Sequence, residues 1–169
     1  MSLKELTKEV HQQAERQDFV HELMSGKMSE EMYAKFLWNQ HAIYNLLEAC
    51  AMANSLFNDF PTVRRAPKIL ADFQELWKES ENPTLTESSE KYVRHIGDFS
   101  GVQMIKKRAP GKGTMYEFDC DIKETKEIIR SKTSDSMAEE AKLCFEYATQ
   151  LFKELYAEKK ETDQQVGSN

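Results

Sequence analysis

Glycine and proline are scarce in this chain and occur at only a few places. The 169 residues include six glycines and four prolines. A sheet protein needs turn residues after every short strand, so this scarcity favours long helices over a turn-rich sheet fold. The length suits one domain with a sizeable core and is short for two. We therefore predict an all-α fold, a single-domain helical bundle.

The spacing of apolar residues predicts six helices. Ser2 and Glu5 have the spacing of a capping box and open the first helix, and Pro67 fits the first turn of the third. Apolar residues recur at helical spacing through each segment. The six helices are predicted to begin near residues 2, 29, 67, 87, 121 and 136, with loops at 58–67, 79–86 and 108–113. Residues 1–160 are expected to form the domain, and residues 161–169 a disordered polar tail.

Charge and composition exclude several classes of function. The net charge is −6, which argues against general nucleic-acid binding. No apolar run approaches the roughly 18 residues of a membrane span, and the charged, periodic N-terminus is unlike a signal peptide. Cys50, Cys120 and Cys144 lie far apart and are odd in number, which is typical of reduced thiols. We expect a soluble cytoplasmic protein, in the host cytoplasm if the chain is phage-encoded.

The first predicted helix carries a basic face with one histidine. Lys4, Lys8, His11 and Glu15 lie at i, i+4, i+7 and i+11, so the four share one face beside the apolar stripe. An imidazole there could ligate a metal, the lysines could meet carboxylates, and Glu15 could accept the other ring N–H. Haem, with a central iron and two propionates at one edge, has this charge layout. A solvated face with one ion pair is the alternative.

Three further histidines and one further basic pair have weaker signals. His21, His41 and His95 have no cationic companions and are interpreted as solvated surface residues. Lys126 and Arg130 lie at i, i+4 on the fifth predicted helix. Alone they form a solvated basic face, whereas beside Lys4 and Lys8 they would complete a positive rim around two propionates.

The fourth predicted helix contains two glycines one turn apart. Gly97 and Gly101 interrupt a strongly helical pattern, with Asp98 and Ser100 between them. Each glycine costs about 1 kcal/mol relative to alanine in a helix interior. Without a Cβ atom the backbone can approach something flat, or the helix can kink. Close helix–helix packing through small residues is the alternative.

Taken together, these segments resemble haem oxygenases of the helical type. The resemblance is carried by LKELTKEVHQQAE at 3–15, HIGDFSGVQMIKK at 95–107, the helix with Lys126 and Arg130, and EEAKLCFEYATQLFKEL at 139–155. These segments keep their order and cover most of the chain. The resemblance implies the haem oxygenase bundle, with haem between the first, proximal helix and the glycine-containing distal helix.

The resemblance also implies a role for each site residue. His11 would be the proximal iron ligand, with Glu15 as its partner. Asp98 would anchor a water network, with Arg94 and Tyr44 behind it, beside the haem-facing backbone of Gly97 and Gly101. The remaining haem-binding residues would be Lys4, Lys8, Tyr92, Lys126 and Arg130 at the propionates, Ser100 on the distal helix, and Phe145 and Phe152 as apolar pocket residues. Phe145 and Phe152 could equally be ordinary core.

The chain departs from the family pattern at two positions of the site. Val102 stands where a glycine usually follows Gly101, and Ala148 stands where the last helix often has an asparagine. The middle of the chain is also shorter than in the longer relatives. These differences bear on which meso carbon is attacked and on the water arrangement.

The activity implied is oxidative cleavage of haem, iron protoporphyrin IX, at a meso carbon, which is expected to be the alpha carbon. Haem would be both substrate and oxygen-activating cofactor, and O₂ and external electrons would yield biliverdin, carbon monoxide and ferrous iron. Ferredoxin or a flavin reductase would supply the electrons, because the chain has no flavin or nucleotide motif, and a bilin reductase could use the product. Basic clusters at 64–68 and 106–112 could dock an acidic donor, or be solvated loop charge.

Two other functions fit the same residues. One is a haem-binding carrier or sensor without turnover, and the other is a haem-free helical bundle of the thiaminase kind. The second would need a nucleophilic cysteine with nearby partners, which the sequence does not offer in any obvious form.

Overall fold

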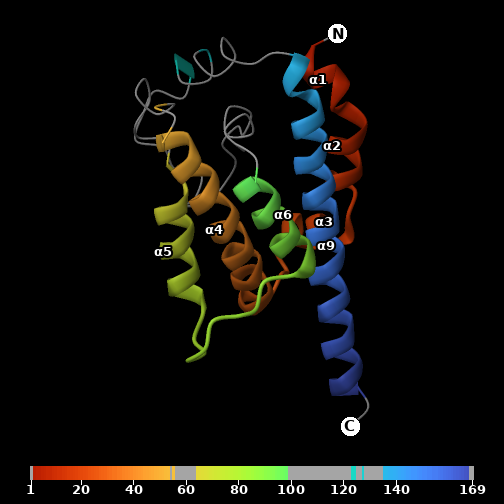
Figure 1. Cartoon of the computed structure of the whole chain (residues 1–169). Coiled ribbons are helices and arrows are strands. Elements are labelled where there is room, and N and C mark those ends of the chain that lie inside the picture. Colours follow the sequence, from red (N-terminus) through yellow and green to blue (C-terminus); the bar gives the residue numbers. More distant parts are fainter. Residues whose placement is uncertain are drawn as a thin grey trace.

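The computed structural model describes residues 2–53, 55, 64–98, 123, 124, 127 and 135–167. Its described elements are helices, which confirms the predicted all-α class (Figure 1). They are α1 (Leu3–Leu6), α2 (Lys8–Glu15), α3 (Asp18–Met24), α4 (Glu30–Ala53), α5 (Ala66–Leu76), α6 (Glu87–Asp98), the 3₁₀ helix η3 (Asp135–Met137) and α9 (Ala138–Gly167). The fifth predicted helix, the loop at 108–113 and most of the loop at 58–67 lie outside the described residues.

The N-terminal helix begins as predicted but is divided at Thr7. The Ser2 hydroxyl accepts from the N–H of Glu5, and the Glu5 carboxylate accepts from the N–H of Ser2, which completes the capping box. Thr7 is buried, and its hydroxyl donates to the Leu3 carbonyl at 2.9 Å. The Leu3 carbonyl accepts this side-chain bond in addition to the helical bond from the N–H of Thr7, and Thr7 is the residue that separates α1 from α2. The helical bonds Thr7 N–H to Leu3 and His11 N–H to Thr7 continue on either side, so the face is continuous.

Helix α3 was not among the predicted elements. It places Phe19 fully inside the core and ends at Met24, with Ser25 as its C-cap and Gly26, whose φ is +74°, as the next residue. A glycine in the left-handed region directly after a helix is a common C-terminal signal, and the N–H of Gly26 bonds to the Leu23 carbonyl. The seven-residue helix is too short for a clear periodic pattern, which explains why spacing alone did not predict it.

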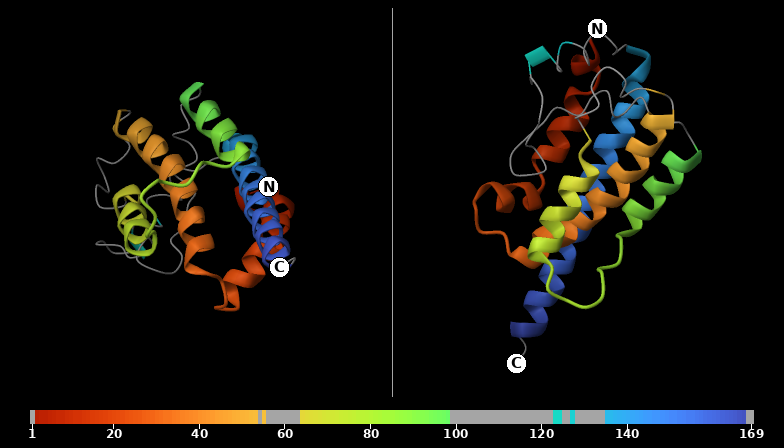
Figure 2. Two further views of the ribbon diagram at one scale, coloured as in Figure 1. Left: turned by 90° about the horizontal axis from the view of Figure 1, so that it is seen from below. Right: turned by 90° about the vertical axis from the view of Figure 1, so that its left-hand side faces the viewer.

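The long helices α4 and α9 form the centre of the bundle. Figure 1 and Figure 2 show α2 packed along α9, and α4 packed against both α6 and α9, with α5 on α4. One buried cluster joins α3, α4, α6 and α9, and a second joins α4 to α5. α9 is helical to Gly167. The predicted boundary at residue 160 and the disordered tail at 161–169 stay predictions.

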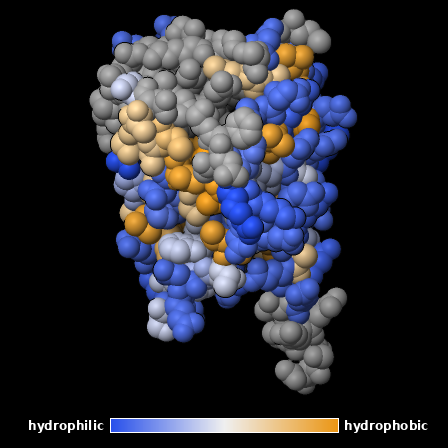
Figure 3. All heavy atoms as spheres, viewed as in Figure 1, coloured by the Kyte–Doolittle hydropathy of each residue, from blue (hydrophilic) through white to orange (hydrophobic). Residues whose placement is uncertain are grey.

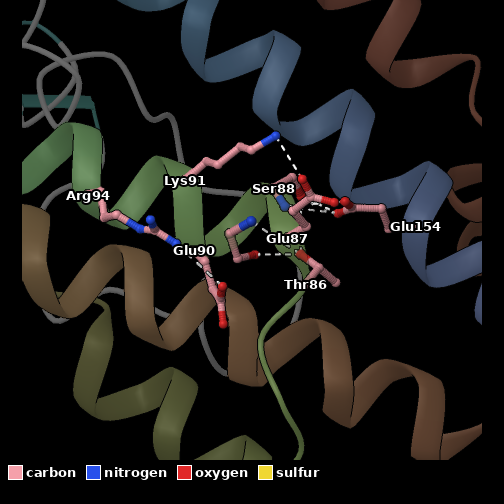
Figure 4. A network of polar contacts seen from close by, with 8 residues as sticks. Thr86, Glu87, Ser88, Glu90, Lys91, Arg94 and Glu154 are labelled. Atoms are coloured by element: carbon pink, nitrogen blue, oxygen red, sulfur yellow. Dashed lines mark hydrogen bonds and ion pairs between the residues drawn. The ribbon is translucent and has the colours of Figure 1, made fainter.

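Polar contacts fix the ends of α5 and α6. Helix α5 begins at Ala66 with Pro67 in its first turn, as predicted, and buried Glu48 of α4 accepts from the N–H groups of Arg65 and Ala66. Helix α6 begins after the predicted loop. Glu154 extends from α9 to the start of α6, where it accepts from the backbone N–H and the hydroxyl of Ser88 (Figure 4). Both carboxylates therefore satisfy N–H groups that a helix start leaves unpaired.

Burial raises the pKa of Glu48, although the N–H groups of Arg65 and Ala66 and the charges of Arg64 and Arg65 partly offset it. The side chain is 2% exposed, and its Oε2 lies 3.5 Å from Arg64 Nε. Because the folded-state pKa lies above the ordinary value of 4.5, folding favours protonated Glu48. That contribution is fully present below the pKa of the unfolded chain and is lost as the pH rises through the folded-state pKa.

We therefore expect Glu48→Gln to gain stability relative to the wild type as the pH rises from about 4 to about 7. Glutamine keeps a carbonyl oxygen for the helix start and has no charge to desolvate. Urea unfolding midpoints measured across this range give the difference. Glu31→Gln is the control, because Glu31 is 70% exposed and paired with Lys35 on the same helix. A difference that is independent of pH would show that Glu48 does not carry the shift.

Candidate functional site

His11 lies on α2 with its ring held by two contacts. Its Nε2 is 2.9 Å from Oε1 of Glu15, one turn further along the helix. The Phe145 ring of α9 stacks on the imidazole at a centroid distance of 4.8 Å and an interplanar angle of 27°. An ionised carboxylate can only accept, so the nitrogen facing Glu15 carries the hydrogen. In the neutral imidazole the other nitrogen, Nδ1, presents a lone pair, and no described residue forms a hydrogen bond with it.

The two lysines of the predicted basic face are exposed. Lys4 on α1 and Lys8 on α2 precede His11 by two turns and one turn, and no ion pair joins either to a carboxylate within the described part of the chain. Figure 3 shows hydrophilic residues over much of the side formed by α2 and α9, with apolar residues gathered between the helices. The His11 side chain is 52% exposed. The side of α2 that carries the histidine is therefore open to a ligand with negative groups.

Helix α6 brings the first part of the glycine segment to the bundle. Its last described residues, Gly97 and Asp98, have helical backbone and follow Ile96, which is fully buried. The Arg94 side chain is 75% exposed, and its Nη2 lies 3.6 Å from Oε2 of Glu90. Its guanidinium therefore faces a residue of its own helix (Figure 4). Gly101, Ser100, Lys126 and Arg130 lie outside the described residues.

The predicted aromatic contacts lie mainly in the core. Tyr92 is buried, and its ring stacks on Tyr147 of α9 at 4.5 Å. Phe152 packs against Phe19 at a centroid distance of 5.1 Å. Tyr44 is partly buried against the cluster that joins α4 and α5. Of the predicted apolar pocket residues, Phe145 is therefore the one that contacts the histidine, and the ligand contacts of Tyr92, Tyr44 and Phe152 stay predictions.

The interpretation of His95 as a solvated surface residue is wrong. Its side chain is 28% exposed, and its Nε2 lies 3.2 Å from Oε2 of Glu140 on α9. The two residues are 45 positions apart in the sequence. Local spacing cannot reveal such a pair, because it depends on how two helices pack.

The predicted basic cluster at 64–68 is less exposed in the structure than its sequence implies. Arg65 is 6% exposed, and Arg64 faces the buried Glu48 carboxylate. Two of the basic residues are therefore directed to the start of α5. The second predicted cluster, at 106–112, lies outside the described residues. No helix within the described ranges is long and apolar enough to cross a membrane.

Comparison with known proteins gives matches by sequence and by structure. The family model described as "Heme oxygenase" matches residues 1–91, more than half of the chain. "Heme oxygenase 2" of Rattus norvegicus is 28% identical over 203 residues, and that of Macaca fascicularis is 27% identical over 204. Each match covers 90% of this chain, which spans 64% of the length of these relatives.

A solved structure has the same fold. The crystal structure of heme oxygenase-1 from the cyanobacterium Synechocystis in complex with heme matches with a TM-score of 0.70 and 22% identity. The match covers 98% of this chain and 96% of that one. The predicted family resemblance is thereby confirmed, and the chain belongs to the haem oxygenase family.

Proposed function

We propose that this protein is a haem oxygenase that binds haem through His11 and opens the porphyrin at a meso carbon, the alpha position. The products would be biliverdin, carbon monoxide and ferrous iron, formed with O₂ and external electrons. The observation that carries the proposal is the His11 imidazole, which Glu15 and Phe145 hold while one ring nitrogen stays available.

The residues on α1 and α2 fit haem in charge and in ligand type. A macrocycle already supplies four nitrogens to its iron, so one imidazole is a sufficient protein ligand on one side. Glu15 would keep the ring in the tautomer that ligates. Exposed Lys4 and Lys8 would attract the two propionates, with Lys126 and Arg130 proposed to complete the rim.

On the distal side of the haem, we propose that the backbone of α6 contacts the ring. Gly97 has no Cβ atom, so the α6 backbone could approach the flat ligand at van der Waals distance, and Gly101 is proposed to act in the same way. Asp98 would hold a proton-delivering water next to the reacting edge, with Tyr44, Ser100 and Arg94 as more distant polar groups. Haem bound there is both the substrate and the group that activates oxygen.

The electrons would come from a ferredoxin or the flavin domain of a reductase, in the cytoplasm. Because Arg65 is buried and Arg64 faces Glu48, the surface around 64–68 offers less positive charge than its sequence implies. The exposed Lys4 and Lys8 would be occupied by propionates. We therefore place the docking charge on residues 106–112, and a bilin reductase could take the product.

A hemin titration followed by reduction in air tests the proposal. We expect one hemin per chain, a Soret band typical of histidine-ligated haem, and conversion of that band to a biliverdin spectrum on adding ascorbate. His11→Ala should remove the histidine signature, and Glu15→Ala should weaken haem binding by about 10- to 100-fold. His21→Ala is the matched control, because His21 is exposed on the neighbouring helix α3.

The outcomes separate the candidate functions. A stable Soret band that survives ascorbate and oxygen would indicate a haem carrier or sensor on this fold. No spectral change on adding hemin would exclude haem binding and leave a haem-free helical bundle. An unchanged histidine signature in His11→Ala would show that the proximal ligand is another residue.

Asp98→Asn tests the distal assignment. We expect haem affinity to stay within about twofold, and biliverdin formation to fall by about 10²-fold, because asparagine cannot exchange a proton with the water that Asp98 would hold. Part of the turnover should become peroxidase-like, measured with an added phenol. Asp18→Asn is the control, because Asp18 is an exposed residue at the start of α3. Wild-type rates of biliverdin formation in Asp98→Asn would remove Asp98 from the mechanism.

A further inference from the structure

Helices α6 and α9 run antiparallel and contact one another at several points along α6. At the start of α6, Ser88 donates to Glu154 (Figure 4). Half-way along, the Tyr92 ring stacks on Tyr147, whose hydroxyl lies 3.2 Å from the Ser89 hydroxyl. These contacts set the height and the rotation of α6 on α9.

The last contact in this series is the pair of His95 and Glu140. Its atoms are 3.2 Å apart, and the side chains are 28% and 22% exposed, so water screens them only in part. Glu140, Tyr147 and Glu154 are spaced by seven residues, which keeps them on one side of α9. His95 precedes Gly97 by two residues and Asp98 by three, so among the described residues this pair is the polar contact with α9 that lies nearest to Gly97, next to the apolar packing of Ile96.

The same part of α9 also holds the proximal histidine. Phe145, which stacks on His11, follows Glu140 by five residues, or about 7.5 Å along the helix axis. One and a half turns of α9 therefore contact both the helix that carries His11 and the helix that carries Gly97. A change at either contact alters the position of one side of the site relative to the other.

We infer that His95 and Glu140 are positioning residues that fix the backbone at 97–98 relative to His11, and thereby select the meso carbon that is opened. The inference rests on the proposed function. If main chain rather than a side chain directs the attack, its placement decides which edge of the ring reacts. A misplacement of about 1 Å can cost about 10²-fold in the rate at one position, so a shift of this backbone would change which edge is favoured.

The test compares variants that lose the contact with one that keeps it. His95→Leu and Glu140→Ala remove it, whereas His95→Gln retains an N–H donor that can reach Glu140. Glu87→Gln is the matched control, because it breaks the exposed pair of Glu87 with Lys91 on the same helix. Circular dichroism and thermal unfolding first establish that each variant is folded.

The first measurement uses the haem-free protein. Hydrogen exchange at amides 95–98 should be about tenfold faster in His95→Leu and Glu140→Ala, the effect of losing one hydrogen bond to a charged group. Amides 90–92, close to the contacts of Ser88 and Tyr92, should exchange at wild-type rates. His95→Gln and Glu87→Gln should match the wild type throughout. Unchanged exchange at 95–98 in both loss variants would overturn the inference whatever the protein does with haem.

The second measurement is the composition of the bilin product. The loss variants should bind haem with wild-type affinity but give a mixture of biliverdin isomers, and His95→Gln should restore the wild-type isomer. A single unchanged isomer in the loss variants would refute the selection of the meso carbon while leaving the proposed function intact. If the wild type forms no biliverdin, the proposed function fails and this part of the inference fails with it, whereas the exchange result still decides whether the pair holds α6.

Discussion

The two sides of helix α9 set the distance between the helices of the candidate site. Residues 145, 152 and 159 are spaced by seven, as are residues 140, 147 and 154, and the two series are offset by about 140° around the helix. The first series contacts α2 and α3, and the second contacts α6. The contacts of the first series are Phe145 with His11, Phe152 with Phe19, and Lys159 with Glu22. Because both series lie on one helix, α9 fixes the positions of α2 and α3 relative to α6.

Apolar packing supplies most of the strength of this arrangement. Stacked aromatic pairs contribute about 0.5–1.5 kcal/mol each beyond the burial of their area, whereas exposed ion pairs contribute about 0–1 kcal/mol. Phe19 and Leu151 are fully buried between α3, α4 and α9. The polar contacts of Glu154 and Glu140 act chiefly on register, because they are directional and lie near the two ends of α6. Packing therefore stabilises the bundle, and the carboxylates align its helices.

The sequence could predict what depends on neighbouring residues. The capping box at Ser2 and the contact of His11 with Glu15 are both local, since their partners lie three or four positions away. Pro67 at the start of α5 is local as well. The sequence could not predict that Thr7 is buried or that the Tyr92 ring stacks on Tyr147. Helical spacing shows which residues share a face, but it does not show what covers that face.

This difference between local and tertiary contacts divides the candidate site into two parts. The part around His11 is assembled within α2, because Glu15 lies one turn along the same helix, and the stacked Phe145 ring of α9 adds to the hold on the imidazole. The segment that leads to Gly97 has no such local support. Its position is determined by α9, through residues that lie 45 or more positions away in the chain. Under the proposed function, substitutions on α2 should act mainly on the imidazole that would ligate the iron, whereas substitutions on the α6 side of α9 should act mainly on the position of the Gly97 backbone. The two kinds of change can then be separated by experiment, because affinity for the ligand follows the first and the choice of product follows the second.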